Sequence, residues 1–263
     1  MVSSKPNLSF TPDIWLNVLG MKFHRVPAVT FDMGSPRSES RRFADEELHS
    51  VVLTRDFYLS IYPVTQAEWR AVLGENPSKN QGINRYPVES VSWYDCMRYL
   101  EKINSEEYRF ELTKNLGTEW IYSLPTEAQW EYVCRAGTRS VFYFGDVPTG
   151  GEANFGKGSN EIGGQESTNL KNRSICEVGS YPPNCWGFYD MCGNVCEWTL
   201  DGYGDYATER VVDPAGVPYA SERVARGGSW RSPPDNCRSA SRFNFLPTYR
   251  GDNCGLRLAI VRS

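Results

Sequence analysis

The side chains of this sequence best suited to chemistry are eight cysteines. Thiolates bind soft metals and act as nucleophiles, and Cys192-x-x-x-Cys196 has the spacing of half a zinc site. The chain holds only 2 histidines, His24 and His49, and no second cysteine pair lies at zinc-site distance. The pattern therefore favours buried or free thiols over zinc. The other six are Cys96, Cys134, Cys176, Cys185, Cys237 and Cys254.

Three helices that could position such groups are predicted from their start signals. Each start is a Ser or Thr followed three residues later by an acidic residue or Gln. This is a capping box, in which both side chains satisfy backbone N–H groups. The starts are Thr65, Ser92 and Thr126, and Gly74 and Gly137 are stop signals for the first and third helices.

Strands are predicted where apolar residues alternate or β-branched residues cluster. Between about residues 140 and 260, Gly, Asn and Asp are dense and only short strands are expected. Turns, side chains or bound ions must then satisfy the backbone of that part. The predicted strands are residues 20–27, continued by 29–33, then 51–54, 57–59, 224–226 and 256–261.

Composition and charge narrow the classes of function. A net charge of -4 without a basic block argues against nucleic-acid binding. No apolar run is long enough for a membrane span. Residues 1–5 do not resemble a signal peptide, so a secreted or lipid-anchored protein would have lost that segment before this start. No linker or repeat divides the chain, so we expect one domain, residues 19–263, after an N-terminal extension, residues 1–18.

Seven motifs occur in order along the chain, among them Arg-Gly-Gly-Ser-Trp at 226–230. Together they resemble the formylglycine-generating-enzyme (sulfatase-modifying factor) family from about residue 20 to 260. The resemblance implies an α+β, loop-rich C-type lectin-like fold with paired N- and C-terminal strands. This fold hosts oxidases, iron-dependent sulfoxide synthases and non-catalytic display proteins, so it does not fix the function. The other motifs are residues 31–35, 57–65, 86–93, 124–132, 135–138 and 187–198.

The oxidases of this family bind copper(I) with two cysteines, separated by four residues, that follow the Gly-Gly-Ser motif. Aligned from that motif, the second cysteine falls on Cys237 and the first on Ser232. A serine hydroxyl is a hard, neutral ligand, so no copper is expected. A formylglycine-generating oxidase that keeps Cys237, with Cys254 as a substitute for the lost partner, is the alternative. The sulfoxide synthases need three histidines and are excluded by the count of 2.

The C-terminal segment, residues 226–260, alternates family positions with residues that follow no period. The first kind includes Arg238, Arg242, Arg250 and residues 255–258. The second kind mixes aromatic with small polar side chains, as paratopes do. We refer to these as the interleaved residues. They are Arg231, Ser232, Pro233, Asp235, Asn236, Ser241, Phe243, Asn244, Phe245, Leu246, Thr248, Tyr249, Gly251, Asp252 and Asn253.

This alternation resembles the variable proteins of diversity-generating retroelements, of the TvpA type. The resemblance implies a fixed scaffold that presents a changing binding surface. We therefore expect a non-catalytic, monomeric binding protein at a bacterial cell surface or in the periplasm, with an unknown protein or surface ligand as its partner. The alternative is that the interleaved residues are ordinary loop residues of a degenerate family member.

The family also implies a structural calcium ion at residues 187–198. The ligands would be the carboxylates of Asp190 and Glu197 and the carbonyls of Gly193 and Val195, which suit a hard cation. The alternative is that Asp190 and Glu197 pair with a nearby arginine. We expect the arginines of the C-terminal segment to pair with carbonyls and carboxylates. They would thereby hold the family positions of the segment in place, and we call these family positions the frame.

Overall fold

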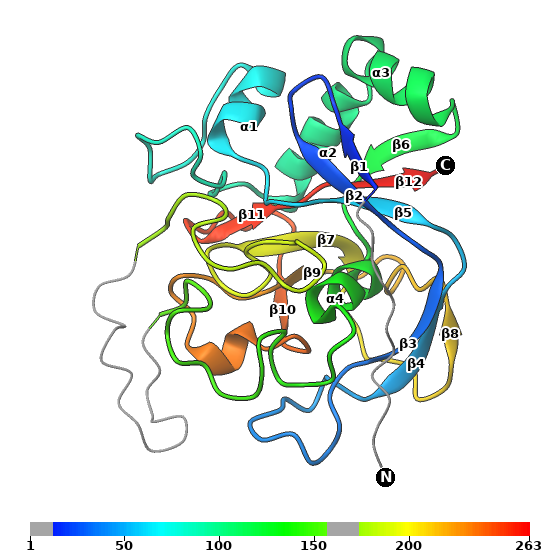
Figure 1. Cartoon of the computed structure of the whole chain (residues 1–263), viewed down its shortest axis with the longest axis vertical. Helices are drawn as coiled ribbons and strands as arrows, with labels where there is room; N and C mark the ends of the chain where they lie inside the picture. Colours follow the sequence, from blue (N-terminus) through cyan, green and yellow to red (C-terminus); the bar gives the residue numbers. More distant parts are fainter. Residues whose placement is uncertain (1–12, 157–173) are drawn as a thin grey trace.

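The computed structural model describes residues 13–156 and 174–263. Residues 1–12 of the predicted extension lie outside this part. The largest sheet has the order β1-β2-β5-β12-β6 (Figure 1). The first and last parts of the chain thus share one sheet, with β5 between β2 and β12 in place of the direct pairing expected. The strands are Ile14–Leu16, Lys22–Val26, Phe57–Ser60, Ala259–Arg262 and Trp120–Ser123.

Two of the predicted strands are each divided into two in the structure. Residues 20–33 are not one strand, because Pro27 has no N–H to donate and the chain leaves the large sheet there. Residues 256–261 split into β11 and β12 around Arg257, whose side chain binds the Ser60 and Ile61 carbonyls. One sheet has the order β10-β9-β7-β11 and the other β3-β4-β8. Their strands are Arg242–Phe245, Arg223–Arg226, Cys196–Gly202 and Cys254–Leu256, then Val29–Met33, His49–Leu53 and Val211–Val212.

The three predicted helices are confirmed with their caps. They are α1 (Gln66–Leu73), α2 (Trp93–Ile103) and α4 (Glu127–Arg135), and each begins at a complete capping box. A further helix, α3 (Glu106–Leu116), has no side-chain cap and only Leu112 buried. A helix with so little apolar face gives no periodic signal, which explains why it was not predicted.

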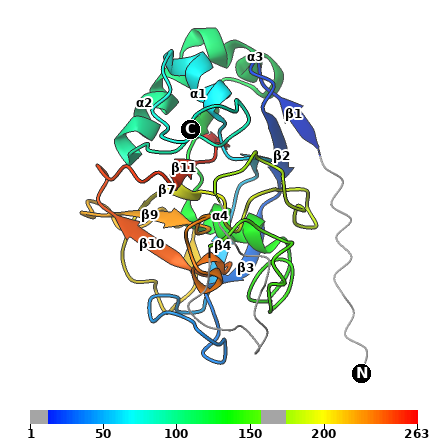
Figure 2. The same cartoon turned by 90° about the vertical axis from the view of Figure 1, so that its left-hand side faces the viewer.

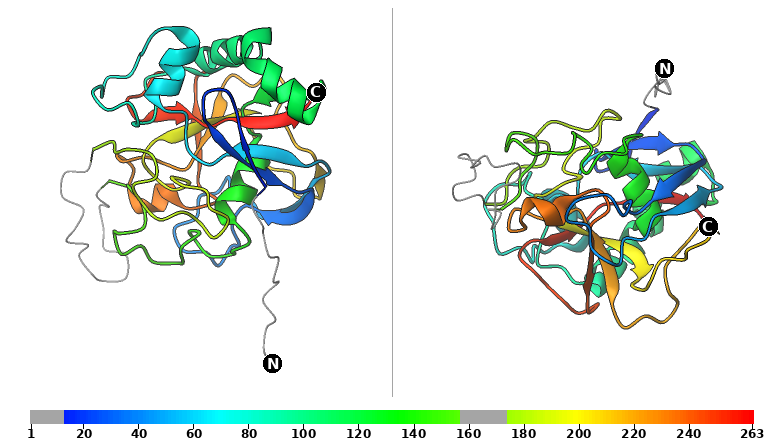
Figure 3. Two further views of the ribbon diagram at one scale, coloured as in Figure 1. Left: turned by 45° about the horizontal axis from the view of Figure 1, so that its top comes forward. Right: turned by 90° about the horizontal axis from the view of Figure 1, so that it is seen from below.

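The helices α1, α2 and α3 gather at one end of the molecule, and the loop between β3 and β4 lies at the other (Figure 1). The 3-10 helix η1 (Pro234–Cys237) lies near that second end, as the view from below in Figure 3 shows. In Figure 2, β9 and β10 lie on the same side of the molecule as the chain that leads into β11. No helix of the described residues is long and apolar enough to span a membrane.

Candidate binding face of the C-terminal segment

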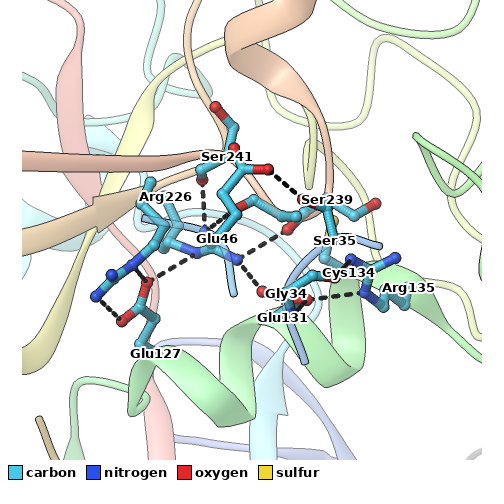
Figure 4. A network of polar contacts seen from close by, with 12 residues as sticks. Gly34, Ser35, Glu46, Glu127, Glu131, Cys134, Arg135, Arg226, Ser239 and Ser241 are labelled. Carbon is cyan, nitrogen blue, oxygen red and sulfur yellow. Dashed lines mark hydrogen bonds and ion pairs between the residues drawn. The ribbon is translucent and has the colours of Figure 1, made fainter. Parts of the chain in front are cut away.

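The C-terminal segment is anchored by Arg226, whose side chain is fully buried. Its guanidinium donates to the carbonyls of Ser239 (2.8 Å), Ala240 (2.9 Å) and Ser241, and to the carboxylate of Glu131 (Figure 4). A planar guanidinium carries five N–H donors in fixed directions, and here it joins three successive carbonyls to α4. One side chain therefore sets the path of the backbone between η1 and β10.

Two further arginines, Arg238 and Arg242, extend this anchoring. Arg242 donates to both oxygens of Glu127 on α4, at 2.7 and 3.0 Å. Arg238 donates to Glu39 at 2.8 Å and to Glu46 at 2.8 Å, and it is 1% exposed. Buried charges of this kind are stable only when paired and hydrogen-bonded, as all of these are. The segment is thus tied to α4 and to the loop between β3 and β4.

The Gly-Asn motif at 193–194 holds the start of the same segment. The N–H of Gly193 donates to the Gly227 carbonyl at 2.8 Å, and the N–H of Trp230 donates to the Asn194 carbonyl at 2.9 Å. Asn194 has a φ of 62°, in the left-handed region that Asn tolerates better than most residues. Residues 227–230 therefore run beside 193–194, and the two motifs form one unit.

The exposed fraction of the side chains separates most family positions of the C-terminal segment from the interleaved residues. The family positions are buried from Cys237 to Ala240, at Arg242 and over residues 255–258, while Arg250 is exposed and paired with Asp95. Of the interleaved residues, thirteen reach the surface at least in part. Exposed are Arg231, Asn244, Leu246, Thr248 and Tyr249, and half-buried are Ser232, Pro233, Asp235, Asn236, Phe243, Phe245, Asp252 and Asn253.

Two interleaved residues, Ser241 and Gly251, are buried, which corrects the prediction for both. The Ser241 carbonyl binds Arg226, so this residue belongs to the frame. The Gly251 carbonyl accepts from the N–H groups of Ser90 (2.9 Å) and Cys254 (3.0 Å). Both positions serve backbone hydrogen bonds, the Ser241 side chain is buried, and Gly251 has no side chain to present to a partner.

Three aromatic interleaved residues, Phe243, Phe245 and Tyr249, form a stack. The ring centroids of Phe243 and Phe245 are 6.1 Å apart, and those of Phe245 and Tyr249 are 4.4 Å apart. Phe245 also meets the buried Trp198 edge-on, at 5.9 Å. Phe243 and Phe245 share one face of β10, so the prediction that no period exists is wrong over this short strand. The stack rests on the core and ends at the surface with Tyr249.

Beside this stack, charged interleaved residues pair with one another. Arg231 binds Asp252 at 2.7 Å, and its guanidinium lies 4.5 Å from the centre of the Trp230 ring. The Asn253 amide donates to the Ser229 hydroxyl at 3.0 Å. Aromatic, charged and amide groups are therefore mixed among the accessible interleaved residues, which together we call the interleaved face. It comprises the thirteen accessible interleaved residues.

Comparison of the whole chain with known proteins agrees with the family that the order of the motifs indicated. Residues 20–262 match the model of the sulfatase-modifying factor enzyme 1-like domain. The chain belongs to this family. It is 30% identical to the mouse formylglycine-generating enzyme over 81% of the chain and 53% of that protein. It spans between 34% and 59% of the length of several curated relatives.

Two solved structures of this fold are similar to nearly the whole chain. Treponema denticola variable protein 1 is 26% identical with a TM-score of 0.78, and 95% of this chain and 99% of that chain are covered. PvdO from Pseudomonas aeruginosa is 28% identical with a TM-score of 0.74, and 95% and 98% are covered. The expected mixed α and β, loop-rich fold of the family is thereby confirmed.

The positions that bind copper in the family's oxidases are here a hydroxyl and a buried thiol. Ser232 Oγ lies 3.0 Å from Ser229 Oγ and accepts from the Ser229 N–H at 3.1 Å. Cys237 is fully buried, and burial raises the pKa of its thiol. Cys254, the suggested substitute, lies beside Cys196 in the register of β11 and β7. A buried thiol with a raised pKa at one position and a hydroxyl at the other do not offer the thiolate pair that copper(I) prefers.

The residues predicted to hold calcium are engaged by protein groups. Both oxygens of Glu197 accept from Arg257 at 2.9 Å, and Oε2 also accepts from the Trp130 indole at 2.7 Å. Asp190 accepts from the Gly179 N–H at 2.7 Å. A guanidinium on Glu197 opposes a second cation there, so the arrangement fits the arginine alternative better than the calcium set. Calcium binding by Asp190, Gly193, Val195 and Glu197 stays a prediction.

The remaining chemistry-bearing residues take structural positions. Cys192 and Cys196 do not act as a pair, because Cys192 contacts Cys134 and Cys196 contacts Cys254. Among the described residues, no three His, Cys, Asp or Glu side chains are grouped so that they could hold a metal ion. His24 is buried in β2 against Phe188, and His49 lies on β4 in a different sheet.

The partners of the frame arginines could not be named from the sequence. Glu127 and Glu131 lie 115 and 95 residues away from Arg242 and Arg226. Their one local signal is that both occur on the helix that begins at the Thr126 capping box, four residues apart and therefore on one face.

Proposed function

We propose that the chain is a non-catalytic binding protein whose C-terminal segment presents an exchangeable surface on a fixed frame. The observation that carries the proposal is the division of that segment by burial. Frame residues such as Arg226 and Arg242 are buried and hydrogen-bonded, while thirteen interleaved residues reach the surface. Substitutions on such a face leave the frame's contacts intact.

The likeness to Treponema denticola variable protein 1 over 95% of the chain supports this proposal. A retroelement that diversifies the interleaved codons would change the binding face without touching the buried arginines. We place the protein at a bacterial cell surface or in the periplasm, as a monomer, with a protein or a surface molecule as its ligand. A reverse transcriptase gene beside this gene, with a near-identical repeat of the segment, would support diversification.

A direct test randomises the five exposed positions 231, 244, 246, 248 and 249 in a display library. Most members should fold, and selection against an arbitrary immobilised protein should return binders. A matched library randomises the buried positions 226, 238 and 242 and should return mostly unfolded members. If both libraries lose folded members equally, the division into frame and face is wrong.

The alternative function is that of a formylglycine-generating oxidase, which the 30% identity to the mouse enzyme favours. This function predicts that the protein binds copper(I) and converts the cysteine of a sulfatase-derived peptide to the aldehyde. We expect neither, because Ser232 stands in place of a thiolate. Aldehyde formation that is lost in Cys237→Ser would overturn the binding proposal. The variant Ser232→Cys is the control that restores the cysteine pair.

A further inference from the structure

A cavity of about 540 Å³ lies at the end of the molecule opposite α1, α2 and α3. Its walls are the loop between β3 and β4, the loop that follows α4, and η1, all of which are visible in the view from below in Figure 3. This volume falls within the roughly 300–1,000 Å³ typical of small-molecule sites. Nothing in the proposed function uses it.

Charge is distributed over this cavity in a regular way. Each of its three walls contributes one cationic and one anionic side chain, so the described residues that line the cavity carry no net charge. A ligand with only one sign of charge would meet as many repelling as attracting groups. The pairs are Glu39 and Arg41, Arg139 and Asp146, and Asp235 and Arg238.

Two of the six charged groups form a fixed floor. The side chains of Arg238 and Glu39 are 1% and 5% exposed and lie 2.8 Å apart. Arg238 also binds Glu46, which holds its guanidinium in place. Burial raises the pKa of Glu39 against the opposing pull of Arg238. Buried charges held in this way keep their orientation when a ligand enters.

The mouth of the cavity offers groups that are less firmly held. Arg139 is 90% exposed and lies 3.2 Å from Asp32, itself 50% exposed, in a pair of the kind that contributes little stability. Asp146 is exposed and accepts one hydrogen bond, from the Val141 N–H at 3.0 Å. Val147, 56% exposed, follows Asp146 in the chain and adds an apolar side chain to the lining.

We propose that this cavity binds a small zwitterion the size of a dipeptide, with an ammonium and a carboxylate at its two ends. Its carboxylate replaces Asp32 as the partner of Arg139, and its ammonium binds Asp146. A small apolar side chain of the ligand packs against Val147. The site is separate from the proposed function, because only Asp235 belongs to both the cavity and the interleaved face.

The test is isothermal titration calorimetry of the full chain with alanyl-alanine and its two blocked forms. N-acetylation removes the ammonium and amidation removes the carboxylate. We expect saturable binding of the free dipeptide at millimolar concentration and at least roughly tenfold weaker binding of each blocked form. Equal binding of the three compounds, or no binding of the free dipeptide, would overturn the proposal.

Variants locate the site. Arg139→Gln and Asp146→Asn change exposed side chains, so both should fold, which circular dichroism verifies. Each variant should bind the free dipeptide about tenfold more weakly than the wild type does. Arg139→Gln should also abolish the difference between the free dipeptide and its amide. Arg37→Gln is the matched control, since Arg37 is 85% exposed and lies on the loop between β3 and β4, another wall of the cavity, but does not itself line the cavity. Unchanged affinity in both test variants, or an equal loss in Arg37→Gln, refutes the assignment.

Discussion

Replacing the buried Arg226 with Gln should destabilise the protein more than any change on the interleaved face. The substitution removes the charge that faces Glu131 and leaves up to three carbonyls, those of residues 239–241, without their donor. Breaking a buried ion pair by removing one partner costs about 3–5 kcal/mol. The Gln amide can satisfy one of these acceptors, so we expect a loss of about 4 kcal/mol.

For a domain of this size, about 4 kcal/mol corresponds to a fall in Tm of roughly 8–16 °C. The matched control is Arg231→Gln, whose guanidinium is 53% exposed and binds Asp252 at 2.7 Å. An exposed pair of this kind contributes about 0–1 kcal/mol, so the control should melt within a few degrees of the wild type. Differential scanning calorimetry at neutral pH measures both variants.

A double-mutant cycle decides whether the loss comes from the Arg226–Glu131 pair. Glu131→Gln alone should also be costly, because it leaves Arg226 and Arg135 facing a neutral amide. The two changes together should cost less than the sum of the single changes. If Arg226→Gln loses less than about 1 kcal/mol, or if the two losses simply add, the frame is not held by these buried guanidinium contacts.

Three further predictions concern pH, packing and metal. Burial and then the nearby charge of Glu127 raise the pKa of Asp201 to about 8, so the folded protein keeps a proton that the unfolded chain loses above about pH 4. The free energy of unfolding should therefore fall as pH rises from about 4 to about 8, by at most about 5 kcal/mol, and Asp201→Asn should remove this fall in pH-dependent urea titrations. Phe245→Ala should cost about 2–3 kcal/mol through its contact with Trp198, whereas Thr248→Ala should cost under about 0.5 kcal/mol, both measured as shifts in the urea midpoint. Because Arg257 already pairs with Glu197, calcium chloride should leave Tm unchanged relative to EDTA. A calcium-dependent rise in Tm that Asp190→Asn abolishes would instead support the ion site predicted from the sequence.

Whether a feature could be predicted from the sequence depends on how far apart along the chain its interacting residues lie. The helices at Thr65, Ser92 and Thr126 were predictable because a capping box joins residues three apart. The helix α3 lacks such a cap and could not be predicted. Sheet neighbours such as Cys254 and Cys196 are joined by tertiary contacts that leave no local pattern. The order of the strands therefore came only from the structure.

Within the C-terminal segment, the sequence predicted side-chain exposure better than backbone roles. Ser241 and Gly251 were assigned to the face because they lie between family positions such as Arg242 and Arg250. Both are buried and their carbonyls accept hydrogen bonds from distant residues, which residue type does not report. Phe243 and Phe245 were assigned as aromatic contacts, but β10 places them against the core. Ser241 and Gly251 are therefore the positions where composition alone misleads, whereas Phe243 and Phe245 are half-buried and keep their place on the interleaved face.

The use of arginine in the frame offers a physical reason why this fold can present an exchangeable surface. A segment held mainly by apolar side chains would need many of its own residues in the core, and few would be left to vary. Here Arg226 and Arg242 fix the backbone on both sides of residue 241 through carbonyl and carboxylate contacts. Such contacts depend on the backbone of the neighbouring residues, not on their side chains. Exposed positions such as 231, 244 and 248 are therefore released from a role in folding and can change with the ligand.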